Sequence, residues 1–374
     1  MKMAGNKIIH FNRPLVPDIA DLQPYLNKIM SSRLLTNNGP VHDEFEEKLT
    51  KYLGVSHISL FSSGTLALAL ALKALDLKGQ VITTPFTSVA TIQAIYWNNL
   101  VPVFVDIDEM DLNISVAEIE KAITPETCAI LPVHIFGNPC EVEQIQKIAD
   151  KYNLKVIYDA AHCFGVDLNG ETLSKYGDLS VLSFHATKVF NTIEGGAVIS
   201  HDEKTKKYLD ALKNTGLNGG FQLMGYGLNA KMNEFQAAFG LTLLKYTEDA
   251  IVKRRNATIQ YRELLQNRIG LKFLTEKEGV KYNYGYFPVI IDPDDFGTTR
   301  DEVCDFLLEK MIYSKKYFYP LVSDFKEFSR FKTRPLPVAE KIALNILCLP
   351  LYHDITDDDI QCIVKSLLKR TDEI

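Results

Sequence analysis

Short apolar runs alternate with longer helix-like stretches between residues 56 and 200. Stretches such as TLALALALKAL (65–75) and EVEQIQKIADKY (141–152) have helical patterns. The runs between such stretches have the length and apolar character of buried strands: SHISLF (56–61), QVITTPF (80–86), CAILPVHIFG (128–137), LKVIYDA (154–160), DLSVLSF (178–184) and GGAVIS (195–200). This alternation predicts an α/β fold, in which a mainly parallel sheet is covered by helices on both faces.

Two details refine the predicted sheet. The stretch 65–75 is apolar nearly all round, so we expect a helix that is buried in the molecule. The runs 178–184 and 195–200 are joined by a connection too short for a crossover helix, which makes one of them a candidate for antiparallel pairing.

The pattern changes after residue 232. Residues 232–268 read as helical with a break at Thr247-Glu248-Asp249, where an N-cap signature lies, and YNYGYFPVII (282–291) reads as a strand of a different unit. Residues 300–311 and 354–370 read as helices, the second with Thr356 as its N-cap. We therefore predict a large α/β domain over residues 1–245 and a smaller α+β domain over residues 246–374.

Composition narrows the class of protein. Of 374 residues, 46% are hydrophobic and 24% charged, which is typical of a globular protein, and the net charge of −6 argues against nucleic acid or an anionic membrane as a partner. No window approaches the roughly 18 apolar residues of a membrane span, and the start MKMAGNKIIH lacks the apolar core of a secretory signal. The six cysteines form no C-x-x-C pair, which favours reduced thiols and a cytoplasmic location.

The string Ser62-Ser63-Gly64-Thr65 lies between an expected strand and an expected helix. Backbone amides at a helix start, together with hydroxyl groups, form a seat for a phosphate or another anion. A simple helix cap followed by a glycine turn is the alternative.

Asp159 ends the run LKVIYD and precedes Ala160, Ala161 and His162. A carboxylate at a buried strand end needs a cationic or strongly donating partner, such as the pyridinium nitrogen of pyridoxal phosphate (PLP). A cap for the following turn is the alternative for Asp159, and a core position is the alternative for His162.

Lys188 lies between apolar residues and follows Ser183, His185 and Thr187. A lysine that forms a Schiff base must be partly desolvated, so that its amine is neutral near neutral pH. The hydroxyl groups nearby are suited to hold a phosphate or to orient the amine. A solvated charge is the usual role of a lysine, but the apolar flanks and the turn Glu194-Gly195-Gly196 argue against it here.

Other chemistries have weaker support. The histidines His134, His162 and His185 lack the close spacing of a zinc motif, so no metal site is predicted. A G-x-S-x-G elbow is absent from the sequence, which argues against serine hydrolysis.

The order of the motifs is more specific than any one of them. An SSGT seat, a V-H-x-x-G strand end, D-A-A-H, S-F-x-x-x-K with E-G-G, and G-x-N-x-K-M-x-E-x-Q-A-A follow one another in the chain. This order resembles the DegT/DnrJ/EryC1/StrS sugar aminotransferases, which are fold-type-I PLP enzymes acting on nucleotide-linked keto sugars. The resemblance extends from LLTNNGPVHDEFE (34–46) to YFYPL (317–321) and implies a seven-stranded, mostly parallel sheet with a small C-terminal domain.

The resemblance assigns roles to individual residues. Lys188 would bind PLP covalently and move protons, and Asp159 would pair with the pyridine nitrogen beside His162. The phosphate would be held by Ser63, Gly64, Thr65 and Ser183. In the family, the residue corresponding to Asn229 reaches the phosphate from the neighbouring subunit, which implies a homodimer with shared sites.

Two positions depart from the family pattern. Family members often place an aromatic residue on the PLP ring where this sequence has Ser88, so either Phe86 or another side chain would have to cover the ring. We retain Ser88 as a candidate cofactor contact. Lys231 replaces an arginine of the family, a change that matters only where bidentate binding is needed.

The resemblance also implies a reaction and its substrates. The strings HATK and FNTIEGG look most like transaminases that convert dTDP-4-dehydro-6-deoxy-D-glucose into dTDP-4-amino-4,6-dideoxy-D-glucose, with L-glutamate as amino donor. His185, Lys213 and Tyr317 are the candidate substrate contacts, and Lys231 and the run 253–255 are further candidate cations for the diphosphate. A solvated helix face is the alternative for that run.

Three alternatives remain open at this point. They are amination at C3, a UDP- or GDP-linked sugar as substrate, and a regulatory protein that binds PLP without catalysis. A PLP-dependent sugar dehydratase is disfavoured, because the dehydratases that this sequence resembles carry histidine in place of the lysine at 188.

Overall fold

The structure, a computed structural model, describes residues 7–220 and 222–372. A seven-stranded sheet lies at its centre, with the strand order β1-β9-β8-β5-β4-β2-β3. Its strands are β1 (His57–Phe61), β2 (Gln80–Thr83), β3 (Val101–Phe104), β4 (Thr127–Leu131), β5 (Lys155–Asp159), β8 (Leu179–Ser183) and β9 (Gly196–Ser200).

The sheet is mostly parallel. Strand β2 pairs in parallel with β3 and β4, β4 pairs with β5, and β5 pairs with β8. Strand β9 runs antiparallel to both β8 and β1. The predicted mostly parallel sheet is confirmed, including the antiparallel strand after the short connection 184–195. That connection carries Lys188.

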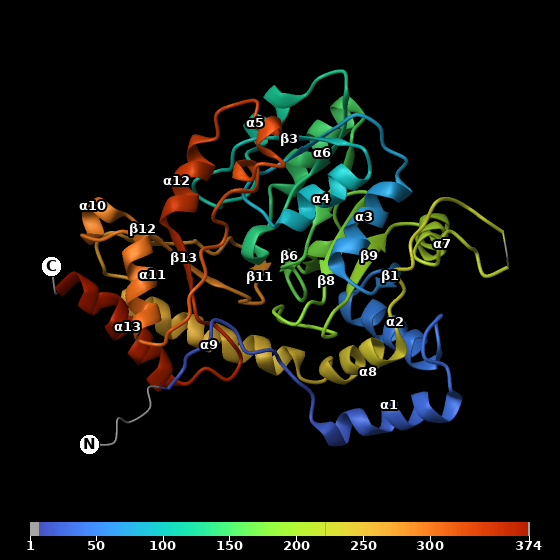
Figure 1. The fold of residues 1–374 in the computed structure, drawn as a ribbon, viewed down its shortest axis with the longest axis horizontal. Coiled ribbons are helices and arrows are strands. Elements are labelled where there is room, and N and C mark those ends of the chain that lie inside the picture. Colours follow the sequence, from blue (N-terminus) through green and yellow to red (C-terminus); the bar gives the residue numbers. More distant parts are fainter. Residues whose placement is uncertain (1–6, 221, 373–374) are drawn as a thin grey trace.

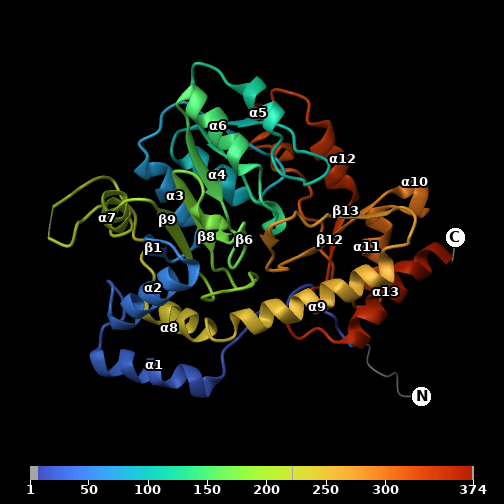
Figure 2. The ribbon, with the colours of Figure 1, turned by 180° about the vertical axis from the view of Figure 1, so that it is seen from behind.

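Helices cover both faces of the sheet, as Figures 1 and 2 show. Alternate residues of each strand enter two separate apolar clusters, because successive side chains of a strand point to opposite faces. One cluster includes α2 (Pro40–Leu53), α5 (Val116–Ala122), α6 (Val142–Tyr152) and α8 (Glu234–Leu243). The other includes α3 (Gly64–Ala74), α4 (Val89–Trp97), α7 (Glu203–Leu212) and α12 (Pro337–Asn345). Residues 67–72 of α3 are all buried, as its apolar sequence predicts.

The C-terminal part has its own apolar cluster. It is built around a three-stranded antiparallel sheet of β10 (Leu271–Phe273), β12 (Phe287–Ile291) and β13 (Ile346–Leu349). The long helix α9 (Thr247–Leu265) packs here with α11 (Arg300–Glu309) and α13 (Asp357–Asp372). The remaining elements are α1 (Ile19–Ser32), α10 (Pro293–Phe296), and a small sheet of β6 (Asp167–Leu168), β7 (Glu171–Thr172) and β11 (Val280–Lys281).

The two parts share residues along the chain. Ile9, near the start, packs in the C-terminal cluster, whereas α12 packs against the large sheet. Residue 245 lies between the end of α8 and the start of α9. A domain division at that residue stays a prediction.

The helix boundaries test two predicted caps. The helical stretch breaks between Leu243 and Thr247, just before the predicted break at 247–249, and the Thr247 hydroxyl donates to the carbonyl of Leu243 at 2.8 Å and does not cap α9. The Thr356 hydroxyl accepts the N–H of Asp359 at 3.2 Å, which confirms it as the cap of α13. Within residues 7–220 and 222–372, no helix has both the length and the apolar character needed to cross a membrane.

Candidate active site

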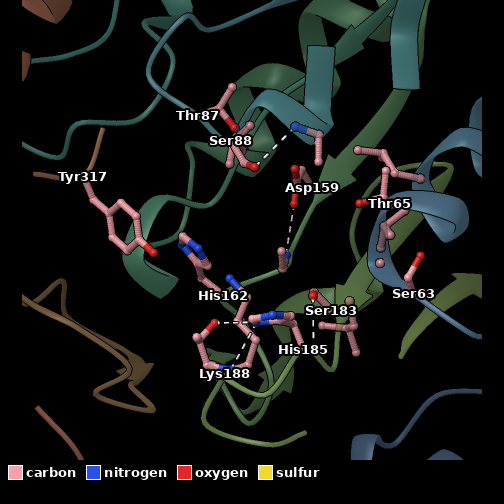
Figure 3. A pocket seen from close by; sticks show the side chains of 18 of the residues that line it. Ser63, Thr65, Thr87, Ser88, Asp159, His162, Ser183, His185, Lys188 and Tyr317 are labelled. Atoms are coloured by element: carbon pink, nitrogen blue, oxygen red, sulfur yellow. Dashed lines mark hydrogen bonds between the residues drawn. The ribbon is translucent and has the colours of Figure 1, made fainter. Parts of the chain in front are cut away.

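A cavity of about 400 Å³ lies at the carboxyl ends of β5 and β8. Ligands of open α/β sheets gather at this edge. Figure 3 shows the side chains that point into the cavity from several elements. It brings together ten of the twelve residues predicted from the sequence: Ser63, Gly64, Thr65, Ser88, Asp159, His162, Ser183, His185, Lys188 and Tyr317.

The SSGT string forms the start of α3, on one side of the cavity. Ser63 is the N-cap of this helix, and its hydroxyl accepts the N–H of Leu66 at 3.2 Å. Gly64 and Thr65 form the first turn, so their backbone N–H groups have no partner within the helix. Ser183 lies beside this turn at the end of β8. The arrangement fits a phosphate group, because helix N-termini favour anions.

Gly64 is required by close packing at this seat. A Cβ atom on Gly64 would lie 2.9 Å from both Cβ and Oγ of Ser183. A Cβ atom on Gly196 would lie 2.7 Å from the Cα of Gly64. The absence of side chains at both positions therefore lets α3 approach the ends of β8 and β9.

Asp159 is buried at the end of β5 and points into the cavity. One carboxylate oxygen accepts the Thr91 hydroxyl at 2.8 Å, and the other accepts the N–H of Ala161 at 3.1 Å. Burial raises the pKa of Asp159, while these two hydrogen bonds and the charge of Lys188 oppose the increase. A cationic ring nitrogen is a partner that would stabilise the ionised carboxylate.

Lys188 lies in the connection between β8 and β9. Phe184 and Phe190 belong to this connection and are buried. Their rings pack edge-to-face with centroids 5.2 Å apart, which holds the connection against the core. Burial lowers the pKa of the Lys188 amine, although the charge of Asp159 acts in the opposite direction. The amine nitrogen donates a hydrogen bond to the hydroxyl of Tyr286 at 3.2 Å.

His162 is held as a neutral ring. Its Nδ1 accepts the backbone N–H of Phe136 at 3.0 Å, which leaves the hydrogen of the neutral imidazole on Nε2. Burial, and then the charge of Lys188, keep the pKa of His162 well below its usual value. The ring is nearly parallel to that of Phe318, at a centroid distance of 6.4 Å.

His185 and Glu194 lie at the exposed side of the cavity. The Nδ1 atom of His185 accepts the N–H of Thr187 at 3.2 Å and also lies 2.8 Å from its hydroxyl. The Nε2 atom of the same ring lies 3.6 Å from a carboxylate oxygen of Glu194. These side chains make the exposed side of the cavity polar.

The structure shows which side chains lie near Ser88, the position where members of the resembling family often have an aromatic residue. Ser88 lines the cavity and caps α4, where its hydroxyl accepts the N–H of Ala90 at 3.3 Å. Phe86 is fully buried and packs edge-to-face against Phe318, with centroids 5.6 Å apart. The aromatic side chains that line the cavity are His162, His185, Tyr286, Tyr317 and Phe318.

Two predicted residues lie outside this cavity. Lys213 is buried elsewhere, 2.7 Å from a carboxylate oxygen of Asp210 and above the ring of Phe61. Within the described chain this lysine therefore balances a half-buried carboxylate. Asn229 is exposed, and its side-chain oxygen accepts a hydrogen bond from Lys231 at 2.9 Å.

The cationic run 253–255 is divided between two environments. Arg254 is fully buried and donates to the carbonyl of Leu351 at 2.9 Å. It therefore belongs to the core of the C-terminal part, and a solvated helix face does not describe it. Lys253 and Arg255 are exposed.

Sequence reasoning missed several residues of the cavity. Thr91, which does not line the cavity but donates a hydrogen bond to Asp159, has a weak signal, because it follows Ser88 in the first turn of α4 and so faces the same end of the sheet. Tyr286 and Phe318 carry no local signal, since they reach the cavity from segments about 100 residues or more after Lys188. Across the described ranges, no three His, Cys, Asp or Glu side chains are grouped so as to hold a metal ion.

Comparisons with known proteins agree on the family. Residues 18–368 match the DegT/DnrJ/EryC1/StrS aminotransferase family. The chain is 46% identical to a dTDP-4-amino-4,6-dideoxy-D-glucose transaminase of Escherichia coli over 370 residues, which cover 97% of this chain and 99% of the relative.

Solved structures show the same likeness. A crystal structure of DesI in the presence of its TDP-sugar product matches with a TM-score of 0.93 at 35% identity, covering 98% of this chain and 94% of that one. A crystal structure of NtdA from Bacillus subtilis with bound cofactor PMP has a TM-score of 0.86 at 28% identity, covering 95% of this chain and 82% of that one. The predicted family, fold type and enzyme class are confirmed. The chain therefore belongs to the DegT/DnrJ/EryC1/StrS family of PLP-dependent sugar aminotransferases.

Proposed function

We propose that the protein transfers the amino group of L-glutamate to C4 of dTDP-4-dehydro-6-deoxy-D-glucose, giving dTDP-4-amino-4,6-dideoxy-D-glucose. The 46% identity to a transaminase named for this product, over nearly the whole of both chains, carries the choice of sugar. The amine of Lys188 at the edge of the cavity, with the buried carboxylate of Asp159 inside it, supports the choice of reaction.

PLP fits the cavity by the chemistry of the groups that line it. The first turn of α3 and the Ser183 hydroxyl would hold the phosphate, and Gly64 leaves room for the close approach of these elements. Asp159 would hold a proton on the ring nitrogen, and His162 lies beside it as a neutral ring. When bound, PLP supplies an aldehyde that accepts the amino group and a ring that takes up electrons.

Lys188 would act as both acid and base. Its amine would first take a proton from the carbon that loses nitrogen and then return a proton to the carbon that gains it. This role needs an amine whose neutral and protonated forms are close in free energy near neutral pH. Burial lowers the pKa of Lys188 and so brings the two forms closer in free energy. His185 and Tyr317 remain the proposed substrate contacts.

We also propose that the protein is a homodimer with shared sites. Asn229 would contribute to the phosphate seat of the second copy, since it is exposed and lies outside the cavity of its own chain. Lys231 would then act only at the border between the copies, whereas Lys213 is buried beside Asp210. Leu35 and Phe235 have exposed apolar side chains, and their segments are joined by the hydrogen bond from the N–H of Glu234 to the Leu35 carbonyl. This exposed apolar surface supports an interface that a second copy covers. The cytoplasmic location stays a prediction.

The test of this function is a product assay. The purified protein, incubated with PLP, L-glutamate and the dTDP-linked 4-keto sugar, is expected to yield the 4-amino sugar, with the aminated carbon assigned by NMR. Amination at C3, or turnover of only UDP- or GDP-linked keto sugars, would replace the proposed substrate by one of the alternatives. The absence of an amino sugar from every keto sugar tested would overturn the proposed function.

A further inference from the structure

Tyr286 contacts the amine of Lys188 within the cavity. It precedes β12, in the C-terminal part of the chain, and its hydroxyl lies 3.2 Å from the lysine nitrogen. The Tyr286 ring also lies 4.6 Å from that of His162 and 6.0 Å from that of Tyr317. The hydroxyl therefore reaches the amine from within a packed aromatic group.

The segment that carries Tyr286 is tied to the segment that follows Asp159. The buried side chain of Asn283 donates to the carbonyls of His162 and Phe164, both at 2.8 Å. Its oxygen accepts the N–H of Gly285 at 3.0 Å. Asn283 thus uses three hydrogen bonds to set the position of the tyrosine relative to the end of β5.

The electrostatic setting leaves Tyr286 as a neutral phenol. Burial raises its pKa, an effect strengthened by Cys348 and opposed by the charge of Arg254. A neutral phenol can both accept and donate a hydrogen bond. The titratable groups that act on the pKa of Lys188 are Asp159, Tyr317 and Cys163, and the neutral ring of His162 lines the same cavity.

We propose that Tyr286 is a positioning residue for Lys188: its hydroxyl accepts a hydrogen bond from the lysine amine, directs the amine into the cavity and favours its protonated form. The long lysine stem has many rotamers, so an unheld amine would meet the substrate carbon in few of them. Hydrogen bonds from a charged donor are the stronger ones, so the contact stabilises the ammonium more than the amine. The inference rests on the proposed function, because that function makes Lys188 the proton carrier.

The experiment measures the pKa of Lys188 in the cofactor-free protein. Acetylation of Lys188 by acetic anhydride is followed against pH, and the modified peptide is quantified by mass spectrometry. For Tyr286→Phe we expect the pKa of Lys188 to fall by about one unit, a tenfold change in the protonation equilibrium. With glutamate, the rate of the amino-donor half-reaction is expected to fall about tenfold or more, as for loss of an oriented acid or base.

Tyr282→Phe is the matched control. Tyr282 lies in the same segment, but its hydroxyl contacts the side-chain oxygen of Asn138 at 3.0 Å. Its loss is expected to leave the pKa of Lys188 unchanged. Asn283→Ala keeps the Tyr286 hydroxyl but frees its segment, so it should lower the pKa of Lys188 by less than Tyr286→Phe does.

An unchanged pKa of Lys188 in Tyr286→Phe would overturn the inference, even where the melting temperature falls. Should Tyr286→Phe not fold, an unchanged pKa in Asn283→Ala would overturn it instead. Since this measurement uses neither sugar nor cofactor, failure of the proposed substrate would leave its outcome intact. A positive result here would likewise leave the identity of the sugar to the product assay.

Discussion

Asp159 combines its proposed role with an energetic cost. Its pKa is raised by burial, so the folded protein binds a proton on this group more tightly than the unfolded chain does. Above the unfolded pKa of 3.8, this difference makes the contribution of Asp159 to stability decrease as the pH rises. The ionised carboxylate is therefore kept for its chemistry.

Replacing Asp159 by asparagine should separate activity from stability. Asp159→Asn retains an oxygen for the hydrogen bond from Thr91 but cannot hold a proton on a ring nitrogen. We expect transamination to fall by a factor on the order of 100 or more, as for loss of a charged partner in a buried site. The melting temperature of the cofactor-free protein should stay equal or rise. A clear fall in melting temperature with normal activity would contradict this reading.

His134 is a buried histidine outside the cavity. Its Nδ1 accepts the N–H of Cys140 at 3.0 Å, and its ring stacks on Tyr158 at a centroid distance of 4.5 Å. Burial lowers its pKa from 6.5 to about 3. Because the unfolded chain binds the proton first, the stability contributed by neutral His134 is lost as the pH falls from 6.5 toward 3.

His134→Gln should reduce the acid sensitivity of the protein. Glutamine keeps an acceptor oxygen but has no charged form. Between pH 7 and pH 5, we expect the variant to lose about 2 kcal/mol less of its free energy of unfolding than the native protein does. Urea denaturation at both pH values measures the difference, and equal losses in the two proteins would contradict the assignment of this pKa.

Among the helices, a buried carboxylate outside the cavity joins two elements that are far apart in the sequence. Glu234 is buried in the first turn of α8 and accepts the N–H groups of Val41 and His42, each at 2.9 Å. These are free donors at the start of α2, where Gly39 occupies the cap position without a side chain. A Cβ atom on Gly39 would lie 2.7 Å from the Glu234 carboxyl carbon.

Removing this long-range cap should destabilise the protein. Glu234→Ala leaves two buried N–H groups without an acceptor, which costs about 2–4 kcal/mol in the free energy of unfolding. Glu234→Gln keeps one acceptor oxygen and should cost less. Chemical denaturation of the two variants tests this order, and equal stability of Glu234→Ala and the native protein would contradict it.

Elements could be predicted where the signal is local. The alternation of apolar runs identified the strands and the buried α3, and Thr356 was recognised as a cap from its position alone. The capping role that the sequence predicts at 247–249 is not filled by Thr247, because its hydroxyl donates back to the carbonyl of Leu243 within the bend. Local sequence shows that a cap is available, whereas the path of the backbone decides which group it meets.

At the scale of the whole molecule, the site was predictable where residues follow the strands of one sheet. Asp159, Ser183 and Lys188 belong to this class, because parallel strands bring their ends to one edge. Tyr286 was not predictable, since its place depends on how the C-terminal part packs against the sheet. Lys213 is the opposite case. It is a predicted substrate contact, but its side chain is buried beside Asp210 and does not line the cavity.

The proposed homodimer predicts complementation between variants. Lys188→Ala and Asn229→Asp should each be nearly inactive alone, and their homodimers should have twice the 42.2 kDa mass of the chain. Refolding a mixture would form heterodimers in which one of the two sites carries no substitution. Activity should then return, because each site takes Lys188 from one copy and Asn229 from the other. No recovery in verified heterodimers would contradict shared sites.

The central claim is that the amine of Lys188 binds PLP covalently and carries the amino-transfer chemistry. The most direct measurement is to incubate the protein with PLP, reduce it with borohydride and locate the modified residue by peptide mass spectrometry. We expect a single phosphopyridoxyl group on Lys188 and its loss in Lys188→Ala. Modification at another lysine, or a native protein that takes up no PLP, would contradict the proposed role of Lys188.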